Sequence, residues 1–483
     1  MRRTIPFAEV AQHNCAGDCW VVIHGRVYDL TEFLGVHPGG SEIILKYAGG
    51  DASAAFAGVH PPDIVAMLAD NAFLGEVSGG DGRASLEPDS QENKKSVGSD
   101  FRVRKGDSTG EEVPATGPSI KKMLRLADFE EAAISRMPRE ALGYITSGAN
   151  DEITLRENRV AWNRLWLRPR VLVDVTSVDA SSRILGFKSS MPVYISATAV
   201  NGLAHPGGEV LVTRAAHAAG VIHMLPTLSS RTLEEMTAAR HPDQVQFYQL
   251  YVSSDRQRAA DMVRCAEVAG CKALFITVDV PVPGRRETDM RCKGVAATLA
   301  GTTVASSATF YDPKLSWADI AWFRSITTMP IVLKGIQAGE DAVQALHLGV
   351  DGIVVSNHGG RQLDGTRSTV QVLAEVMEAL RSLPGRSKME VFVDGGIRRG
   401  TDIFKALALG AKAVGIGRPV LYGLGAFGQD GVEQVLHLLG EELRTCMALM
   451  GTPTLADIKP NLIVSDHRRC YCADEDAYQQ SKL

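Results

Sequence analysis

Eight short apolar runs between residues 191 and 420 constrain the fold of this chain more than any other feature of the sequence. Their hydrophobicity is nearly continuous instead of alternating, which is typical of parallel strands covered on both faces. Amphipathic helical segments separate the runs, most clearly at 254–270, 339–349 and 401–410. Eight such strand–helix units predict an α/β fold of the (β/α)8 TIM-barrel type. The runs span residues 191–199, 220–228, 245–252, 272–280, 329–336, 352–357, 390–397 and 413–420.

The interval between the fourth and fifth runs is longer than any other. The additional residues, 281–313, begin with basic residues and continue rich in Gly, Ala, Ser and Thr. Long loops without secondary structure of their own are often lids over a binding site. We therefore expect this segment to be a mobile loop over the barrel mouth.

A change of composition divides the chain into three parts. Residues 78–118 contain 14 charged side chains and only five from Val, Ile, Leu, Phe and Met. Such a segment cannot bury enough apolar surface to offset the entropy of ordering it, so it is predicted to be a flexible linker. The sequence thus predicts a small domain at 1–77, the linker at 78–118 and the barrel domain at 119–483.

The charge distribution favours a basic partner. The formal net charge is −5, and residues 1–77, with four Lys/Arg against nine Asp/Glu, account for all of it. A nucleic-acid-binding protein would show a basic patch instead, so we expect no nucleic acid among the partners. No run approaches the 18 apolar residues of a membrane span, so no membrane association is expected. The N-terminus shows neither a signal peptide nor a transit peptide, which predicts a cytoplasmic location.

Two histidines stand out in the small domain. His37 begins His-Pro-Gly-Gly, and His60 lies 23 residues later. Together with Trp-Val-Val-Ile-His-Gly-Arg-Val-Tyr-Asp-Leu at 20–30 and Gly-Gly-Asp-Ala at 49–52, they make residues 4–77 resemble the α+β cytochrome b5-like haem domains. The resemblance implies haem b with His37 and His60 as its axial ligands. Two imidazoles saturate the iron and favour electron transfer over oxygen chemistry.

Glycines followed by arginines come after the seventh and eighth apolar runs. They are Gly396 and Arg398, and then Gly417 and Arg418. Backbone N–H groups and guanidinium forks at this position are where barrels commonly bind a phosphate. The pair of motifs therefore predicts a phosphate-bearing cofactor. The chain lacks a Gly-x-Gly-x-x-Gly motif after an early strand, which argues against a Rossmann nicotinamide site.

Ser-Asn-His-Gly-Gly-Arg-Gln at 356–362 is the most specific motif of the chain. With matches at 147–152, 196–199, 249–252, 277–279, 334–335 and 394–396, it makes residues 120–465 resemble the FMN-dependent α-hydroxy-acid dehydrogenase and oxidase family. The resemblance implies FMN as cofactor. The flavin contacts that it implies are Ala197, Thr198, Ala199, Gln249, Thr277, Lys334, Asp394, Gly395, Gly396, Arg398, Gly417 and Arg418.

The same resemblance assigns catalytic roles that suit the chemistry of the side chains. His358 would take a proton from the substrate, for which a group titrating near neutral pH is suited, and Asp279 would orient it. The substrate carboxylate would bind Arg361 and Arg286, because a planar two-donor fork matches a carboxylate better than lysine does. Further roles fall to Tyr251 and Tyr144, as hydrogen-bond partners of the substrate, and to Lys334, as a positive charge near flavin N1–C2.

Two positions bear on the substrate and one departs from the family. Ala199 and Leu228 are compatible with a short side chain such as the methyl of lactate. Apolar pocket contacts discriminate by about 1–3 kcal/mol per methylene, so larger 2-hydroxy acids such as mandelate stay open. Pro226 stands where some family members have a flavin-contacting serine, so that contact is not expected. Hydride and carbanion mechanisms both stay open.

The two resemblances together predict a flavohaemoprotein enzyme. FMN would oxidise a short (S)-2-hydroxy acid, with L-lactate to pyruvate the first choice, and haem would pass single electrons to cytochrome c. One alternative is an oxidase that uses oxygen, with a regulatory or vestigial haem domain. Another is a binding module with an inactive barrel, against which the presence of His358, Arg286 and Arg361 argues. The family also suggests a homotetramer and, as the alternative location, the mitochondrial intermembrane space.

Overall fold

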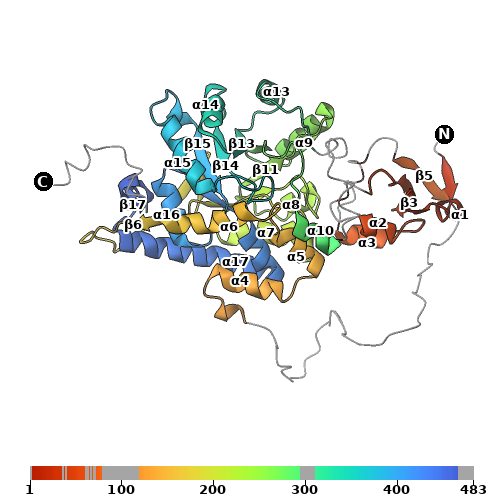
Figure 1. The fold of residues 1–483 in the computed structure, drawn as a ribbon, viewed down its shortest axis with the longest axis horizontal. Coiled ribbons are helices and arrows are strands. Elements are labelled where there is room, and N and C mark those ends of the chain that lie inside the picture. The colour runs from red at the N-terminus through yellow and green to blue at the C-terminus, as the bar shows by residue number, and fades with distance from the viewer. Residues whose placement is uncertain are drawn as a thin grey trace, which may run out of the picture.

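A closed barrel of eight parallel strands forms the centre of the protein in a computed structural model, which describes residues 3–34, 37, 41–59, 65, 68, 72–78, 119–293 and 311–465 (Figure 1). Each strand pairs with the next strand along the chain, and the last pairs with the first. This confirms the predicted barrel. The strands are β9 (Val193–Ile195), β10 (Ile222–Leu225), β11 (Gln246–Leu250), β12 (Leu274–Thr277), β13 (Ile331–Ile336), β14 (Gly352–Val355), β15 (Glu390–Asp394) and β16 (Ala413–Ile416).

Each barrel strand lies within one predicted apolar run, and all eight strands are shorter than their runs. The run at 272–280, for example, contains β12, and its last residues form the loop that carries Asp279. Side chains that point inward fill the barrel, and those that point outward pack under the helices, so both faces of the sheet are apolar. The inward set includes Tyr194, Met224, Phe247, Phe275, Val332, Val354 and Phe392.

Helices surround the barrel and account for the helical periodicity of the sequence. The three clearest predicted segments correspond to α9, α14 and α16. Before the barrel, α4 packs along the long C-terminal helix α17, which is kinked at Phe427 and Gly428. The helices are α4 (Leu126–Ile134), α5 (Arg139–Thr146), α6 (Ile153–Val160), α7 (Gly208–Ala218), α8 (Leu233–Ala238), α9 (Arg256–Val268), α10 (Glu287–Lys293), α13 (Asp319–Ile326), α14 (Gly339–His347), α15 (Thr369–Leu380), α16 (Gly400–Ala408) and α17 (Arg418–Met450).

Two small sheets complete the barrel domain. The hairpin of β7 (Ser182–Ile184) and β8 (Phe187–Ser189) precedes β9, and its Ile184 packs into the inward-pointing cluster. Near the C-terminus, β17 (Ile463–Ser465) pairs antiparallel with β6 (Leu165–Leu167). The hairpin therefore closes the amino end of the barrel and leaves its carboxyl end for the functional site.

Part of the segment 281–313 is helical, whereas the sequence suggested a loop without secondary structure of its own. It contains α10, which packs on α5 and carries a buried ion pair of 2.9 Å between Asp289 and Lys293, one turn apart. This spacing places both side chains on one helix face, which supports a short helix. Residues 294–310 lie outside the described residues.

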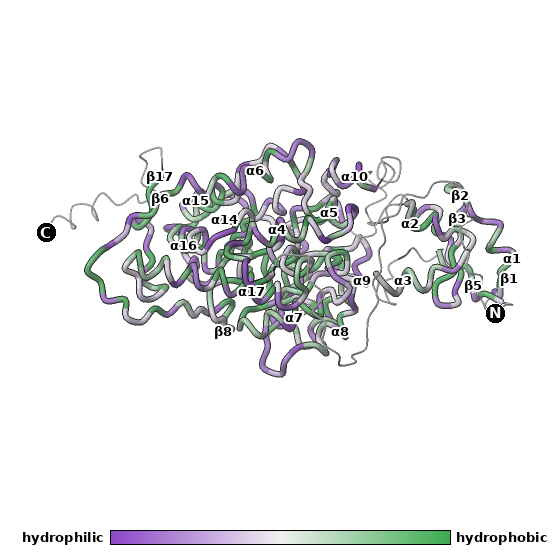
Figure 2. Tube along the Cα trace, turned by 90° about the horizontal axis from the view of Figure 1, so that it is seen from below, coloured by the Kyte–Doolittle hydropathy of each residue, from purple (hydrophilic) through white to green (hydrophobic). Residues whose placement is uncertain are grey.

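The N-terminal domain is a five-stranded sheet with short helices, as expected of a cytochrome b5-like domain. The strand order is β1-β5-β4-β3-β2. In Figures 1 and 2, α2 and α3 lie between this sheet and the barrel. Residues 79–118 of the predicted linker lie outside the described residues. The elements are β1 (Thr4–Pro6), α1 (Phe7–Val10), β2 (Asn14–Cys15), β3 (Asp18–Ile23), β4 (Arg26–Asp29), α2 (Ser41–Leu45), α3 (Ser53–Val59) and β5 (Phe73–Ser78).

Across the described parts of both domains, no helix is both long and apolar enough to span a bilayer.

Candidate active site

The loop after β14 presents His358 at the carboxyl end of the barrel. His358 adopts a left-handed backbone with φ of 56°, which is uncommon for a residue other than glycine. Gly359 and Gly360 continue the turn, and a Cβ at Gly360 would lie 2.6 Å from the backbone nitrogen of Leu155. The buried Asn357 exchanges amide hydrogen bonds of 2.8 and 2.9 Å with Asn158 on α6. These contacts hold the histidine in its turn.

His358 lies between a carboxylate and a phenol. Its Nδ1 is 3.0 Å from Oδ1 of Asp279, which follows β12, and its Nε2 is 3.2 Å from the hydroxyl of Tyr251, which follows β11. The Nδ1–H group donates its hydrogen bond to Asp279. Nε2 therefore carries the lone pair and accepts a hydrogen bond from the Tyr251 hydroxyl. Nε2 is therefore the basic atom of the ring.

Burial and neighbouring charges set the protonation states of this trio. Burial lowers the pKa of His358; the carboxylate of Asp279 opposes this shift, and the positive charges of Lys334 and Arg286 add to it. For Asp279, burial alone would raise the pKa, but the charges of His358 and Lys334 outweigh it and lower the pKa. Burial also raises the pKa of Tyr251. At neutral pH the site thus holds a neutral imidazole, a carboxylate and a protonated phenol.

Two guanidinium groups and the Tyr144 ring form the cationic side of the site. The guanidinium carbon of Arg361 lies 4.8 Å from the centre of the Tyr144 ring, and that of Arg286 lies 6.0 Å from it. Burial, and then the nearby Arg286, lower the pKa of Arg361 to about 10. In the described part of the chain neither arginine pairs with a carboxylate, whereas the adjacent Arg285 and Lys293 do. Two charges held together without a counterion suit an anionic substrate.

Two residues without an assigned role in the sequence analysis also shape this site. Gln362 accepts from the backbone N–H of Gly284 (3.0 Å) and donates to the carbonyls of Asp279 (3.1 Å) and Val282 (2.9 Å). Tyr311 packs edge-on against Tyr251, with ring centres 5.0 Å apart, and both line a small cavity. The motif at 356–362 contained Gln362, but its partners lie about 80 residues earlier. No sequence signal indicated Tyr311.

Lys334 extends from β13 into the barrel mouth. Its Nζ lies 3.7 Å from Oδ2 of Asp394 and 3.4 Å from Oγ of Ser356, and both Lys334 and Asp394 are buried. Oδ1 of Asp394 has no hydrogen-bond partner among the described residues. Asp394 and Ser356 therefore hold the ammonium group of Lys334, while Oδ1 of Asp394 can still accept a further hydrogen bond.

Residues at the ends of β9, β11 and β12 line the neighbouring part of the mouth. Gln249 donates to Thr277 at 2.9 Å and accepts from the backbone of Thr227 at 3.2 Å. The hydroxyl of Thr198 donates to Asn201 at 2.8 Å, and this turn leaves Ala197 and Ala199 partly exposed toward the mouth. These side chains and backbone groups form a polar rim of fixed geometry.

The loops after β15 and β16 show the features of a phosphate site. A Cβ at Gly396 would collide with the backbone of Asn158, and Gly395 and Gly396 both have positive φ. Arg398 keeps a buried Nε without a hydrogen-bond partner among the described residues, and its pKa is lowered by burial and by Arg159. Gly417 immediately precedes α17, whose first N–H groups face this end.

Arg418 is placed differently from a simple phosphate ligand. Its guanidinium donates to the carbonyls of Ile145 (2.9 Å), Ser147 (2.8 Å) and Gly359 (3.0 Å), and burial lowers its pKa to about 9. It therefore ties the end of α5 to the His358 loop. The open Nε of Arg398, the buried Lys334 and the glycine backbone nevertheless fit a phosphate-bearing flavin.

The described part of the N-terminal domain contains one of the two proposed haem ligands. His37 follows Phe33, with a backbone hydrogen bond of 3.0 Å to its carbonyl and ring centres 5.7 Å apart. Partly buried apolar side chains, among them Phe56, Val65 and Leu68, pack against the buried core of this domain. Such a surface fits a porphyrin face. His60 lies outside the described residues.

Comparisons with known proteins agree with this two-domain arrangement. The family model of the FMN-dependent dehydrogenases matches residues 133–465, and that of the cytochrome b5-like haem/steroid binding domains matches residues 6–78. An L-lactate dehydrogenase (cytochrome) of Wickerhamomyces anomalus is 44% identical over 98% of this chain and 82% of the relative. The Saccharomyces cerevisiae protein of that name is 42% identical over 96% and 80%.

Solved structures and oxidases are also similar. A mutant flavocytochrome b2 with pyruvate bound superposes with a TM-score of 0.70 at 41% identity, covering 76% of this chain and 93% of that one. A peroxisomal (S)-2-hydroxyacid oxidase of Arabidopsis thaliana is 43% identical, but it covers 73% of this chain. The oxidase match is thus shorter than the matches to the cytochrome-type dehydrogenases.

Proposed function

The chain belongs to the FMN-dependent dehydrogenase family, and we propose that it oxidises L-lactate to pyruvate and delivers the electrons to cytochrome c. Its cofactors are FMN and haem b, in the arrangement of flavocytochrome b2. When bound, FMN accepts two electrons from the substrate and the haem passes them on one at a time. The observation that carries the proposal is His358, held by Asp279 at 3.0 Å, near two guanidinium groups that have no carboxylate partner among the described residues.

The substrate is bound by its carboxylate and its hydroxyl. Arg361 and Arg286 grip the carboxylate, with the Tyr144 hydroxyl as a further donor, and Tyr251 hydrogen-bonds the substrate hydroxyl. The position of Tyr251, 3.2 Å from Nε2 of His358, supports this because a hydroxyl bound there also reaches the base. Ala199 and Leu228 leave room for the methyl group of lactate.

His358 takes up the proton that the substrate loses. Its Nε2 accepts the proton, and Asp279 stabilises the resulting imidazolium through the 3.0 Å hydrogen bond to Nδ1. The buried, ionised Asp279 supports this role because a charge in a low-dielectric site interacts strongly with the new positive charge.

Residues around the barrel mouth hold the flavin. Lys334 supplies a positive charge near flavin N1–C2, which favours the reduced ring. The remaining contacts are proposed for Ala197, Thr198, Ala199, Gln249, Thr277, Asp394, Gly395, Gly396, Arg398, Gly417 and Arg418. Three of them have a second function in this structure, since Arg418, Gln249 and Thr277 also connect loops of the mouth to one another.

The N-terminal domain relays the electrons. We propose His37 and His60 as the axial ligands of haem b, with domain boundaries at 1–77, 78–118 and 119–483. The acidic composition of residues 1–77 supports a basic acceptor such as cytochrome c. A homotetramer, and a cytoplasmic or mitochondrial intermembrane location, complete the proposal. Mass photometry and cell fractionation test the last two points.

Anaerobic reduction of the haem by L-lactate tests the function. We expect L-lactate to reduce the haem without oxygen, and faster than mandelate does. The H358Q variant should reduce its flavin about 10²-fold more slowly or worse, since a positioned base contributes roughly 10²–10⁴-fold. Binding of FMN and haem in the variant, followed by absorption, is the control. Oxygen consumption without haem reduction would favour the oxidase, and near-normal flavin reduction in H358Q would assign the base elsewhere.

A further inference from the structure

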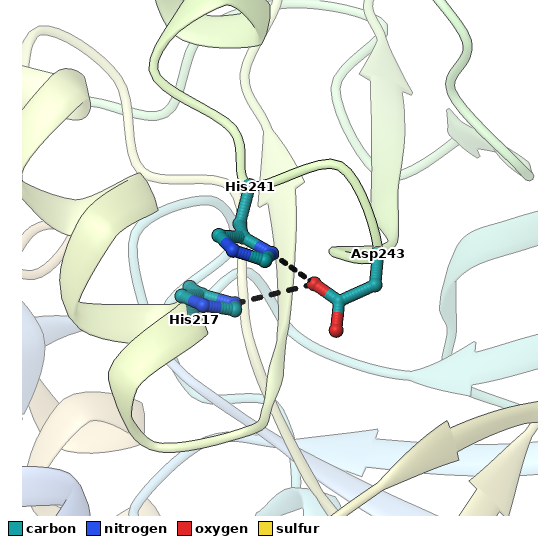
Figure 3. Close-up of side chains that lie close together, drawn as sticks. All are labelled: His217, His241 and Asp243. Atoms are coloured by element: carbon teal, nitrogen blue, oxygen red, sulfur yellow. Dashed lines mark hydrogen bonds and ion pairs between the residues drawn. The ribbon is translucent and has the colours of Figure 1, made fainter.

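Two histidines and an aspartate form a cluster outside the active site. His217 lies in the last turn of α7, and His241 and Asp243 lie in the connection between α8 and β11 (Figure 3). Both segments lead into the amino ends of barrel strands. Because His358 lies beyond the carboxyl end of β14, the cluster and the active site are at opposite ends of the barrel.

The three side chains converge on a single oxygen atom. The imidazole rings are stacked, with centres 4.1 Å apart and planes within 11°. Nδ1 of His217 lies 3.9 Å from Oδ1 of Asp243, and Nδ1 of His241 contacts the same oxygen directly. One potential ligand atom from each residue lies within 4.8 Å of the other two. Within the described part of the chain, this is the single set of three such residues.

This arrangement is nearly that of a metal site. Nitrogen and oxygen ligands lie about 2.0–2.2 Å from a zinc ion, so neighbouring ligand atoms are roughly 3–3.5 Å apart. The side chains are 39%, 53% and 76% exposed. Because they are exposed, these side chains can rotate enough to bring their ligand atoms to the spacing of a zinc site.

The cluster has little reason to form as an ion pair alone. Exposed ion pairs contribute about 0–1 kcal/mol, and a second imidazole stacked on the first could not also be charged without repulsion. A divalent cation bound by the two imidazoles and the carboxylate takes the place of the ring protons and so avoids this repulsion.

We propose that His217, His241 and Asp243 bind a divalent transition-metal ion of the zinc class at the amino end of the barrel. Imidazole ligands select zinc, copper, nickel and related ions over magnesium and calcium, which prefer all-oxygen sites. Three protein ligands leave the remaining coordination positions to water or to a group from another molecule. The ion ties the end of α7 to the connection between α8 and β11, and no step of substrate oxidation involves it.

Zinc titration of the chelator-treated holoenzyme by calorimetry tests the proposal. Other histidines and cysteines, including His467, Cys470 and Cys472, can also bind zinc. The measured quantity is therefore the difference in zinc binding between the unaltered chain and each variant. H217A and H241A should each lower the affinity for one equivalent of zinc at least tenfold. Loss even of an outer-shell hydrogen-bond partner lowers metal affinity roughly 10–100-fold. Magnesium should not compete.

H437A is the matched control. His437 is an exposed histidine on α17, 3.3 Å from Glu441, and lies outside the cluster. We expect this variant to bind zinc like the unaltered chain, and absorption of flavin and haem to show that all three variants are folded. Equal zinc binding by H217A, H241A and the unaltered chain overturns the proposal, as does the absence of any zinc binding by the unaltered chain.

Discussion

At the scale of the residue, the protonation of His358 determines when the enzyme can work. The imidazole must be neutral to accept a proton, and its pKa lies below the ordinary value of 6.5 because burial, Lys334 and Arg286 disfavour the charged form. Asp279 works in the opposite direction and raises this pKa. The low pKa and the hydrogen bond to Asp279 together keep the base ready at neutral pH.

The pH profile of L-lactate oxidation follows from this balance. We expect kcat/KM to fall on the acid side with a midpoint below pH 6.5, since protonated His358 cannot act as a base. In D279N the midpoint should move to lower pH, because the charge that raised the pKa is gone, and the rate should fall by about 10²-fold or more. Stopped-flow flavin reduction between pH 4.5 and 8 measures both. An acid midpoint that stays the same or rises in D279N would contradict the assignment.

A second buried histidine affects stability instead of catalysis. His223, on β10, is fully buried beside the hydroxyl of Thr213 at 3.0 Å, and burial lowers its pKa to about 3. Between about pH 3 and pH 6.5 the unfolded chain therefore binds a proton that the folded chain does not. The free energy of unfolding is therefore unaffected by this group above pH 6.5 and decreases as the pH falls below 6.5.

Replacing His223 should therefore reduce sensitivity to acid. Between pH 7 and pH 5.5, His223 lowers the free energy of unfolding by up to about 1.4 kcal/mol. This is the loss expected for one pH unit below the pKa of the unfolded-state histidine. H223Q should lose less of its melting temperature over this range than the unaltered chain, even if it is less stable at pH 7. Calorimetric scans at both pH values measure the difference. An identical decrease in both proteins would show that other groups cause the acid sensitivity.

At the scale of the element, the loops that follow the strands carry the site, and Gln362 connects two of them. Through hydrogen bonds to Asp279, Val282 and Gly284, it holds the segment after β12 against the loop after β14. That segment leads to Arg286. The spacing between Arg286 and Arg361 thus depends on a residue that does not itself carry charge.

Loss of this connection should weaken substrate binding more than it slows the chemical step. In Q362M the side-chain volume is nearly kept and the three hydrogen bonds are lost, so Arg286 becomes less well positioned. We expect KM for L-lactate to rise about tenfold, equivalent to ~1.4 kcal/mol, the net value of about one to two hydrogen bonds. Steady-state kinetics measure this, with Q257M, at an exposed glutamine on α9, as the control. A lower melting temperature with unchanged KM would indicate a purely structural role.

At the scale of the whole molecule, charge is distributed unevenly between the domains. Residues 1–77 have a net charge of −5, which equals the net charge of the whole chain. The positive and negative charges of the remaining residues therefore balance. Helices α2 and α3 lie on the barrel side of the small sheet in both views of the chain, and Arg258 on α9 reaches the carbonyl of Leu68 at 3.4 Å. The acidic domain is therefore next to the barrel.

Reduction of cytochrome c should depend on salt. Attraction between an acidic domain and a basic acceptor is screened within about 8–10 Å at 0.1–0.15 M ionic strength. Raising the salt from 20 to 300 mM should lower the second-order rate of cytochrome c reduction about tenfold, within the range of steered associations. Flavin reduction by L-lactate is the control and should stay constant. A rate of cytochrome c reduction that does not change with salt would exclude electrostatic steering.

The sequence by itself determined the barrel and the order of its loops. Eight nearly continuous apolar runs are a local signal, since a strand covered on both faces must be apolar at each position, and all eight became strands of one closed sheet. The motif around His358 was equally local. The helix α10 was missed because its short pattern is stabilised by packing on α5 and by one buried ion pair.

Only the tertiary structure decided which distant side chains meet. Gln362 and Gly284, Tyr311 and Tyr251, Arg418 and Ile145, and His217 and Asp243 are each separated by 26 to 273 residues along the chain. Side-chain contacts of this kind depend on how helices and loops pack around the closed barrel. That packing minimises exposed apolar surface over the whole domain and leaves no periodic trace in the sequence.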